Sequence, residues 1–240
     1  MAQSCESIEA AKVPEWTPVE LAILERRSVR KYKDKQVPEA LIRRILEAGR
    51  YAPSAGNCQP WRFAVVRDRA MLEEMERDVV LMCKFFRFFL DWRQPGALSR
   101  LRWLYAQLFI RLRPRDLHPI PFGAITLIAQ GKLKVFHGAP TVILLMKDKR
   151  GVSNPDLDCG ICGQNMVLAA YSLGLSTCWI GFAKLLGYLP KWRRRLKIHY
   201  PWELVEGICL GYPVGNPNGM VEREVRDVDW YEHGQVKTIC

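Results

Sequence analysis

Residues 26–30, with the sequence RRSVR, place one serine among three arginines. Guanidinium groups bind phosphate and carboxylate through paired N–H donors, and a hydroxyl adds a further donor. The segment follows a helix of about nine residues that is predicted to begin at Pro18, because Thr17 is a favourable N-cap and Glu20 completes a capping box. Two interpretations stay open on these residues alone. The arginines either stabilise the negative C-terminal end of that helix or bind an anion.

The loop at residues 51–61, YAPSAGNCQPW, is a second segment with suitable chemistry. Pro53 ends a predicted helix, and Asn57 and Gln59 lie just before the Pro-Trp entry to a predicted strand. Small residues and amides at the end of a sheet can contact a planar polar ligand. Taken alone, the loop is a turn.

Other chemical motifs have less support. Cys159 and Cys162 form a CxxC pair, but no second cysteine or histidine pair lies at zinc spacing, so no metal site is expected. On a helix the two cysteines would share a face, which favours a buried structural pair over a redox role. The four histidines are scattered, and neither GxGxxG nor a Walker A string is present. A dinucleotide-binding turn and a P-loop are therefore not expected.

The elements that must position these residues alternate along the chain. Apolar periodicity predicts helices that begin near residues 18, 38, 70 and 159, and strands at 61–68, 139–148, 176–182 and 203–213, followed by a polar tail. Because no repeat or linker interrupts this order, we expect a single α/β-type domain over residues 1–240.

Residues 84–134 form a basic and aromatic insertion. They contain ten Lys/Arg and two Asp, a net charge of 10 − 2 = +8, and nine aromatic residues: Phe85, Phe86, Phe88, Phe89, Trp92, Trp103, Tyr105, Phe109 and Phe122. A nucleic-acid surface lacks an accompanying recognition motif. An amphipathic surface for acidic lipid is a second interpretation. We favour a third, a helical insertion whose aromatic face packs inward while its arginines face solvent.

Composition sets the protein class. The chain has 240 residues, a formal net charge of +11 and 49% hydrophobic residues, enough for a sizeable core. The N-terminal residues lack the apolar run of a signal peptide, and eight scattered cysteines suit a reducing compartment. The longest uncharged stretch, 159–183, contains amides, hydroxyls and glycines, so a buried helix, a turn and a strand explain it better than a membrane span. We expect a cytoplasmic protein.

Together the two loops resemble the signature of the flavin-dependent nitroreductase family, R-R-S-x-R, an amphipathic helix and then A-P-S-x-x-N-x-Q-P-W-x-F. The resemblance continues through GAPTVILLM, GQNMVLAAYSLGLSTCWIGF and LGYPVG, and covers most of residues 20–231. Residues 83–135 depart from the family pattern. The resemblance implies an α+β fold in three layers, with a central mixed β-sheet flanked by helices. It also implies a homodimer that exchanges C-terminal arms.

The resemblance further implies that FMN is the bound anion. Its phosphate and ribityl chain would be held by Arg26, Ser28 and Arg30 with the backbone at Arg27. Relatives add a cation from the C-terminal arm, for which Arg223 is our first choice and Arg226 the second. Family residues that meet the flavin from the partner subunit match Pro53, Ser54, Ala55 and Asn57. The backbone that faces flavin N5 matches Ile180 and Gly181.

The implied activity is hydride transfer from NAD(P)H to N5 and then, by ping-pong, to a nitroaromatic or quinone-like acceptor. No catalytic side chain is obligatory, because solvent or the flavin can supply protons. A reduced ferredoxin as donor stays open. Residues 84–134 would form a lid that selects acceptors, and no nucleic-acid partner is expected.

Three alternative functions stay open. Reductive dehalogenation and flavin fragmentation occur among proteins of the same fold, but the Glu, Tyr and Lys lid of the dehalogenating branch is not arranged in this sequence. That branch also tends to place a hydroxyl near N5, where this chain has Trp179, Ile180 and Gly181. The third alternative is a non-catalytic flavin carrier or membrane-surface protein.

Overall fold

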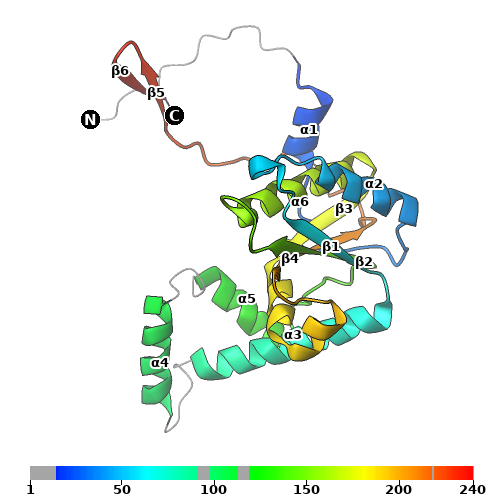
Figure 1. Cartoon of the computed structure of the whole chain (residues 1–240), viewed down its shortest axis with the longest axis vertical. Coiled ribbons are helices and arrows are strands. Elements are labelled where there is room, and N and C mark those ends of the chain that lie inside the picture. Colours follow the sequence, from blue (N-terminus) through cyan, green and yellow to red (C-terminus); the bar gives the residue numbers. More distant parts are fainter. Residues whose placement is uncertain (1–14, 91–97, 113–118, 218, 240) are drawn as a thin grey trace. The chain divides into compact units, whose positions relative to one another are not determined.

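The computed structural model describes residues 15–90, 98–112, 119–217 and 219–239. The chain divides into two compact units, one of residues 27–217 and one of residues 1–26 with 218–240, and each is described by itself (Figure 1). The single domain expected over residues 1–240 stays a prediction. Within the described ranges, no helix combines the length and the apolarity needed to cross a bilayer.

The larger unit is built on a four-stranded sheet in the order β1-β2-β4-β3. Its strands are β1 (Trp61–Val66), β2 (Thr141–Asp148), β3 (Ser176–Ile180) and β4 (Trp202–Gly211), and each pair of neighbours is antiparallel. The parallel contribution expected of a mixed sheet is one isolated bridge, between Ser28 and Thr177. Helices cover both faces, so the predicted α+β class with three layers is confirmed (Figure 1).

The central strand β2 shows why both faces need cover. Val142, Leu144 and Met146 belong to the core on one face, and Ile143 and Leu145 belong to the core on the other. All five are fully buried. Because successive side chains of a strand point to opposite faces, an uninterrupted apolar run fits a strand that is buried on both sides.

One layer consists of α2 (Glu39–Arg50) and α6 (Pro155–Ser172). Ile42 and Ile45 of α2 pack in the same core cluster as Cys159, Cys162 and Met166 of α6. Both cysteines are free thiols, and burial raises the pKa of each to about 12. A protonated, buried thiol is a poor nucleophile, so the structure supports the buried structural pair.

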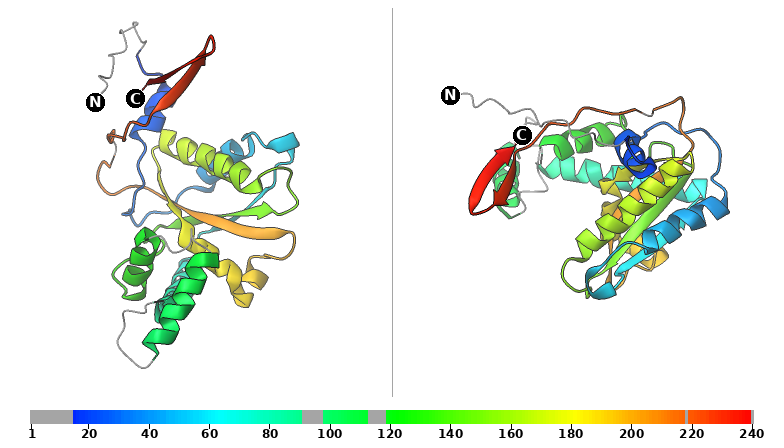
Figure 2. Two further views of the ribbon diagram at one scale, coloured as in Figure 1. Left: turned by 90° about the vertical axis from the view of Figure 1, so that its left-hand side faces the viewer. Right: turned by 90° about the horizontal axis from the view of Figure 1, so that it is seen from above.

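The other layer consists of α3 (Arg69–Leu90), α5 (Pro119–Ala129), the 3₁₀ segment η2 (Gly181–Tyr188) and α7 (Pro190–Arg195) (Figure 2). Leu72, Met75, Val79 and Cys83 of α3 recur at helical spacing and are buried. Helix α7, whose Trp192 is fully buried, was not predicted from the sequence.

The insertion comprises the end of α3, then α4 (Ser99–Leu112) and α5. Phe86 packs against the core, but Phe85, Phe88, Phe89, Trp103 and Tyr105 are exposed. The expectation that the aromatic face packs inward is therefore wrong for these five residues. Trp92 and the side chains of Phe109 and Phe122 lie outside the described residues.

The smaller unit contains α1 (Pro18–Glu25) and a hairpin of β5 (Val228–Glu232) and β6 (Gln235–Ile239). The predicted capping box is present: Glu20 N donates to Thr17 Oγ1 at 3.3 Å, and Thr17 N donates to Glu20 Oε2 at 2.7 Å. In place of the predicted polar tail, the chain turns at His233 and Gly234, both with positive φ, and forms the hairpin.

Candidate functional site

The RRSVR segment leaves α1 and runs in extended conformation beside β3. Val29 N donates to Thr177 O at 3.0 Å, and Ser28 forms the isolated bridge with the same threonine. Further along, Lys33 N donates to Tyr212 O at 2.9 Å, just past the end of β4. These backbone hydrogen bonds hold the segment against the sheet edge and fix which side chains face outward.

Side-chain alternation brings two predicted site residues together. Val29 is 6% exposed and points into the core, whereas Ser28 and Arg30 are exposed. Residues i and i+2 of an extended segment lie on one face, so the Ser28 hydroxyl and the Arg30 guanidinium share a face. The Tyr32 hydroxyl donates to Val29 O at 2.6 Å and stays protonated, because burial raises its pKa. The Ser28 hydroxyl and the Arg30 guanidinium are the kinds of donor that bind a phosphate.

His137 is a neighbour of this face that the sequence analysis missed. It is half-buried, adopts a positive φ of 53°, and lies in the turn before β2. Burial lowers its pKa, and the Arg30 cation lowers it further. The imidazole is therefore neutral near pH 7 and able to accept a hydrogen bond beside Arg30. Its only sequence signal was its position directly before the GAPTVILLM string.

The other end of β3 carries Ile180 and Gly181. Ile180 is buried and pairs with Gly207, and Gly181 begins η2. Ile180 is three positions after Thr177, which corresponds to about 10 Å along the strand. The Ser28/Arg30 face and the Ile180–Gly181 backbone therefore lie at the two ends of one short strand.

Glu206 is a second site neighbour that sequence reasoning did not find. A Cβ at Gly181 would lie 3.4 Å from Glu206 Oε1, so the carboxyl group is next to the Gly181 backbone. Burial raises the pKa of Glu206, and the Lys184 cation opposes that rise. This contact crosses from β4 to η2, and no local pattern signals it.

The APSAGN loop forms a short 3₁₀ turn, η1 (Ala55–Asn57). Gln59 N donates to Ser54 Oγ at 2.9 Å, and Gln59 Nε2 donates to Asn57 Oδ1 at 3.1 Å. Pro53 and Asn57 are exposed, while Ser54 and Ala55 are half-buried. Local hydrogen bonds thus fix a turn that presents small and amide groups outward.

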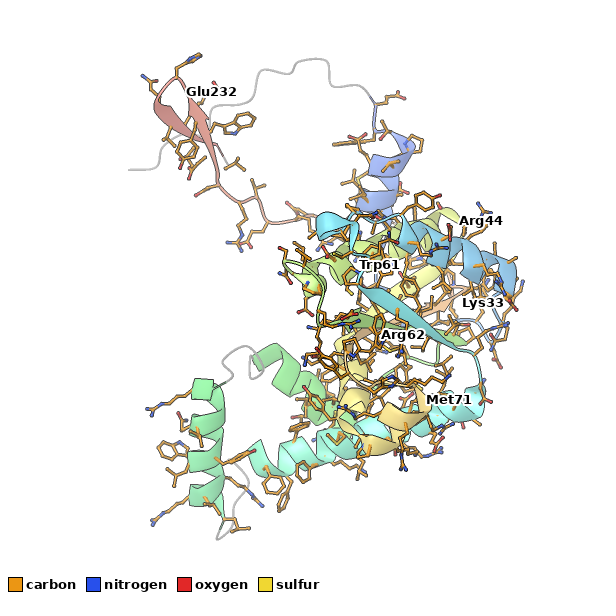
Figure 3. The ribbon with its side chains drawn as sticks, in the orientation of Figure 1. Lys33, Arg44, Trp61, Arg62, Met71 and Glu232 are labelled. Atoms are coloured by element: carbon orange, nitrogen blue, oxygen red, sulfur yellow. The ribbon has the colours of Figure 1, made fainter. Side chains whose placement is uncertain are left out.

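Strand β1 anchors this loop to the sheet. Trp61 packs in the α2/α6 core, and the Arg62 guanidinium donates to Leu196 O at 3.0 Å and Lys197 O at 2.9 Å on the other side (Figure 3). Contacts on both faces of β1 therefore hold the strand in place, and with it the loop that precedes it.

Within one chain the two motifs lie far apart. The loop precedes β1, at one edge of the sheet, whereas Ser28 lies beside β3, at the other edge. Thr177 of β3 pairs with Leu210 of β4, which in turn pairs with Thr141 of β2. Thr141 lies level with the C-terminal end of β1, whereas the loop lies at the N-terminal start of β1. Strand spacing and rise place the two motifs at diagonally opposite corners of the sheet, separated by roughly 25 Å.

Arg26, Arg223 and Arg226 belong to the smaller unit. Arg226 forms an exposed ion pair with Glu224 at 2.6 Å. The assignment of these arginines to the phosphate stays a prediction. The larger unit itself brings together Arg27, Ser28 and Arg30 at one end of β3, and Ile180 with Gly181 at the other.

Comparison with known proteins gives the class that this fold and site define. The model of the Nitroreductase family matches residues 23–212, and the chain belongs to this family. A putative NADH dehydrogenase/NAD(P)H nitroreductase of Methanothermobacter thermautotrophicus is 32% identical over 199 residues, covering 82% of this chain and 78% of the relative.

Solved structures share the fold. A nitroreductase with bound FMN from Desulfitobacterium hafniense has a TM-score of 0.62 at 22% identity, covering 87% of this chain and 95% of its own. A putative nitroreductase in complex with FMN from Desulfovibrio desulfuricans has a TM-score of 0.54 at 26% identity, covering 88% and 93%.

Proposed function

We propose that this chain is an FMN-dependent oxidoreductase that uses NAD(P)H to reduce nitroaromatic, quinone-like or related small organic acceptors by ping-pong. Family membership supports the enzyme class, and the relative from D. desulfuricans in complex with FMN supports the cofactor. The observation that carries the proposal is the extended segment beside β3, which puts Ser28 and Arg30 on one exposed face.

The phosphate is assigned to this face. The Ser28 hydroxyl and the Arg30 guanidinium would donate to its oxygens, with the Arg27 backbone beside them. Arg26 and Arg223 are the proposed additional cations. When bound, FMN supplies the two-electron hydride chemistry of the reaction. The chain contributes position and charge.

The length of β3 supports one orientation of FMN along the strand. A ribityl chain with its phosphate can span the distance from the Ser28 bridge to Ile180, about 10 Å. With the phosphate at Arg30, the Ile180–Gly181 backbone would hold the isoalloxazine ring, and the Glu206 carboxyl group would be the ionisable side chain next to that backbone. No side chain is obligatory for proton transfer, because solvent or the flavin can supply protons.

A second copy of the chain completes the site. Pro53, Ser54, Ala55 and Asn57 lie roughly 25 Å from Arg30 in one chain, too far to contact the same flavin. We assign this loop to the flavin of the partner in a homodimer, together with the exchanged C-terminal arm.

Mixed dimers test the shared site. Arg30→Ala and Ala55→Trp homodimers should each lose flavin. A heterodimer of the two variants has one site with both changes and one intact site, so co-expression should restore flavin binding. Failure to restore it, or sedimentation of a flavin-loaded monomer, would contradict the shared site.

Anaerobic spectroscopy tests the activity. NADH or NADPH should bleach the yellow protein, and a nitroaromatic or quinone should restore the colour, with parallel double-reciprocal plots in steady state. A flavin that neither nucleotide reduces would overturn NAD(P)H dependence. Product analysis with halogenated phenols separates the dehalogenating alternative.

A further inference from the structure

Helix α4 exposes a continuous apolar stripe. Leu101, Leu104, Tyr105 and Leu108 recur at the i, i+3, i+4 and i+7 positions that form one helix face. Their exposed fractions lie between 48% and 63%. Scattered exposed leucines are ordinary, but a contiguous stripe of this kind marks an interaction surface.

The end of α3 continues the same surface. Phe85, Phe88 and Phe89 are exposed, and the Phe89 ring centroid lies 6.3 Å from that of Tyr105 in the stripe. The ring centroids of Phe85 and Phe89 are 4.6 Å apart. Helix α4 lies beside the C-terminal end of α3, away from the sheet (Figure 1). We call these seven residues the α3–α4 surface.

Cations flank the stripe, and α4 carries no acidic residue. At about 100° per residue, Arg100 and Arg111 fall along one border of the stripe and Arg102 along the other. Arg100 and Arg111 are exposed, while the Arg102 guanidinium carbon lies 4.5 Å from the Phe88 ring centroid. Long basic side chains at such a border can reach headgroups while apolar neighbours are buried in lipid.

We propose that the α3–α4 surface binds an anionic lipid surface. A 14-residue helix with three arginines suits the membrane interface rather than the bilayer core. A second copy fits poorly, because a symmetric contact would set arginines against arginines with no carboxylate on either α4. Nucleic acid would engage the cations but leave the leucines exposed to water. Anionic lipid satisfies both groups.

Vesicle sedimentation with the full-length protein tests this. Vesicles of equal parts phosphatidylglycerol and phosphatidylcholine should bind the protein at least about tenfold more tightly than pure phosphatidylcholine, and added salt should weaken binding. Leu104→Gln with Leu108→Gln should remove binding. Arg100→Gln with Arg111→Gln should weaken it roughly tenfold or more.

Matched controls are Leu157→Gln and Arg44→Gln, which change exposed residues on α6 and α2 and should leave binding unchanged. Circular dichroism of each variant confirms folding. The proposal is overturned if wild type ignores lipid charge, or if the double leucine variant binds as wild type.

If residues 84–134 instead act as the predicted lid, the leucine variants should behave differently in these experiments. If the leucine substitutions change KM for large acceptors severalfold without vesicles, and vesicle binding is unaffected, the surface serves substrate and the lipid proposal is wrong. Binding to a single-stranded oligonucleotide that competes with vesicles and ignores the leucine substitutions would also overturn it. Flavin content is independent of all these outcomes.

Discussion

Gly163 sets the separation between α6 and β3. A Cβ at this position would lie 2.1 Å from Cη2 of Trp179 and 2.6 Å from Cζ2, so the indole would have to move. Trp179 directly precedes Ile180, which we place beside the flavin. We predict that Gly163→Ala lowers the free energy of unfolding by about 1–3 kcal/mol and weakens flavin binding. Urea denaturation and flavin fluorescence measure the two effects.

Gly160 provides the control on the same helix. It is exposed, and apart from its chain neighbours and the helix's own backbone, no described atom lies within 4 Å of a Cβ built there. Gly160→Ala should raise the free energy of unfolding by up to about 1 kcal/mol, because alanine favours helix. Equal stability of Gly163→Ala and wild type would contradict the packing argument.

Glu206 should make stability depend on pH. Burial raises its pKa in the folded protein above the ordinary value of 4.5, so the folded state retains the proton longer than the unfolded chain. This contribution is fully present below pH 4.5 and is lost as pH rises through the folded-state pKa. We predict that Glu206→Gln flattens the fall in unfolding free energy above pH 4.5. Parallel wild-type and variant curves across that range would refute the assignment.

At the scale of elements, Asp78 joins α3 to α7. Its carboxylate accepts from Trp192 Nε1 and from Lys191 Nζ, each at 2.7 Å. Trp192 is fully buried, so removal of the acceptor leaves an unsatisfied indole N–H. We predict that Asp78→Ala lowers the free energy of unfolding by about 1–3 kcal/mol in urea denaturation.

Glu39→Ala is the comparison for Asp78. Glu39 pairs with Arg43 at 2.6 Å on the exposed face of α2, and such a pair contributes only about 0.5 kcal/mol. Similar losses for the two variants would mean that Asp78 acts as another surface charge.

Elements with strong local signals were predicted from sequence. The cap at Thr17 and the apolar run of β2 specify their structures by themselves. Helix α7 was missed because Trp192 is buried by core residues distant in sequence, and its indole N–H donates to Asp78 of α3. The β5–β6 hairpin was also missed, although its His-Gly turn between alternating residues was a usable signal.

The inward packing of the insertion could not be judged from composition. Composition gives the number of aromatic residues in the insertion but not which face of each helix packs against the core. In the structure Phe86 meets the core, while Phe85, Phe88 and Phe89 do not. The electrostatic effect of Arg30 on His137, and the approach of Glu206 to Gly181, likewise depend on tertiary structure.

At the scale of the whole molecule, motif order supplied the residues that we propose for the site but not how they are arranged. The RRSVR and APSAGN strings are close in sequence, yet the register of four antiparallel strands puts them at opposite corners of one sheet. This separation is why a second chain is needed in our account.

The central claim is that Arg30 binds the phosphate of FMN, and titration of the apoprotein with FMN and with riboflavin tests it most directly. Arg30→Ala should weaken FMN binding about ten- to a hundredfold, because a charge-assisted phosphate contact is lost. Riboflavin, which lacks the phosphate, should bind wild type and variant alike. The neighbouring Lys31→Ala, which alternates to the other side of the extended segment, should change neither affinity. Unchanged FMN affinity, or an equal loss for both ligands, would contradict the account.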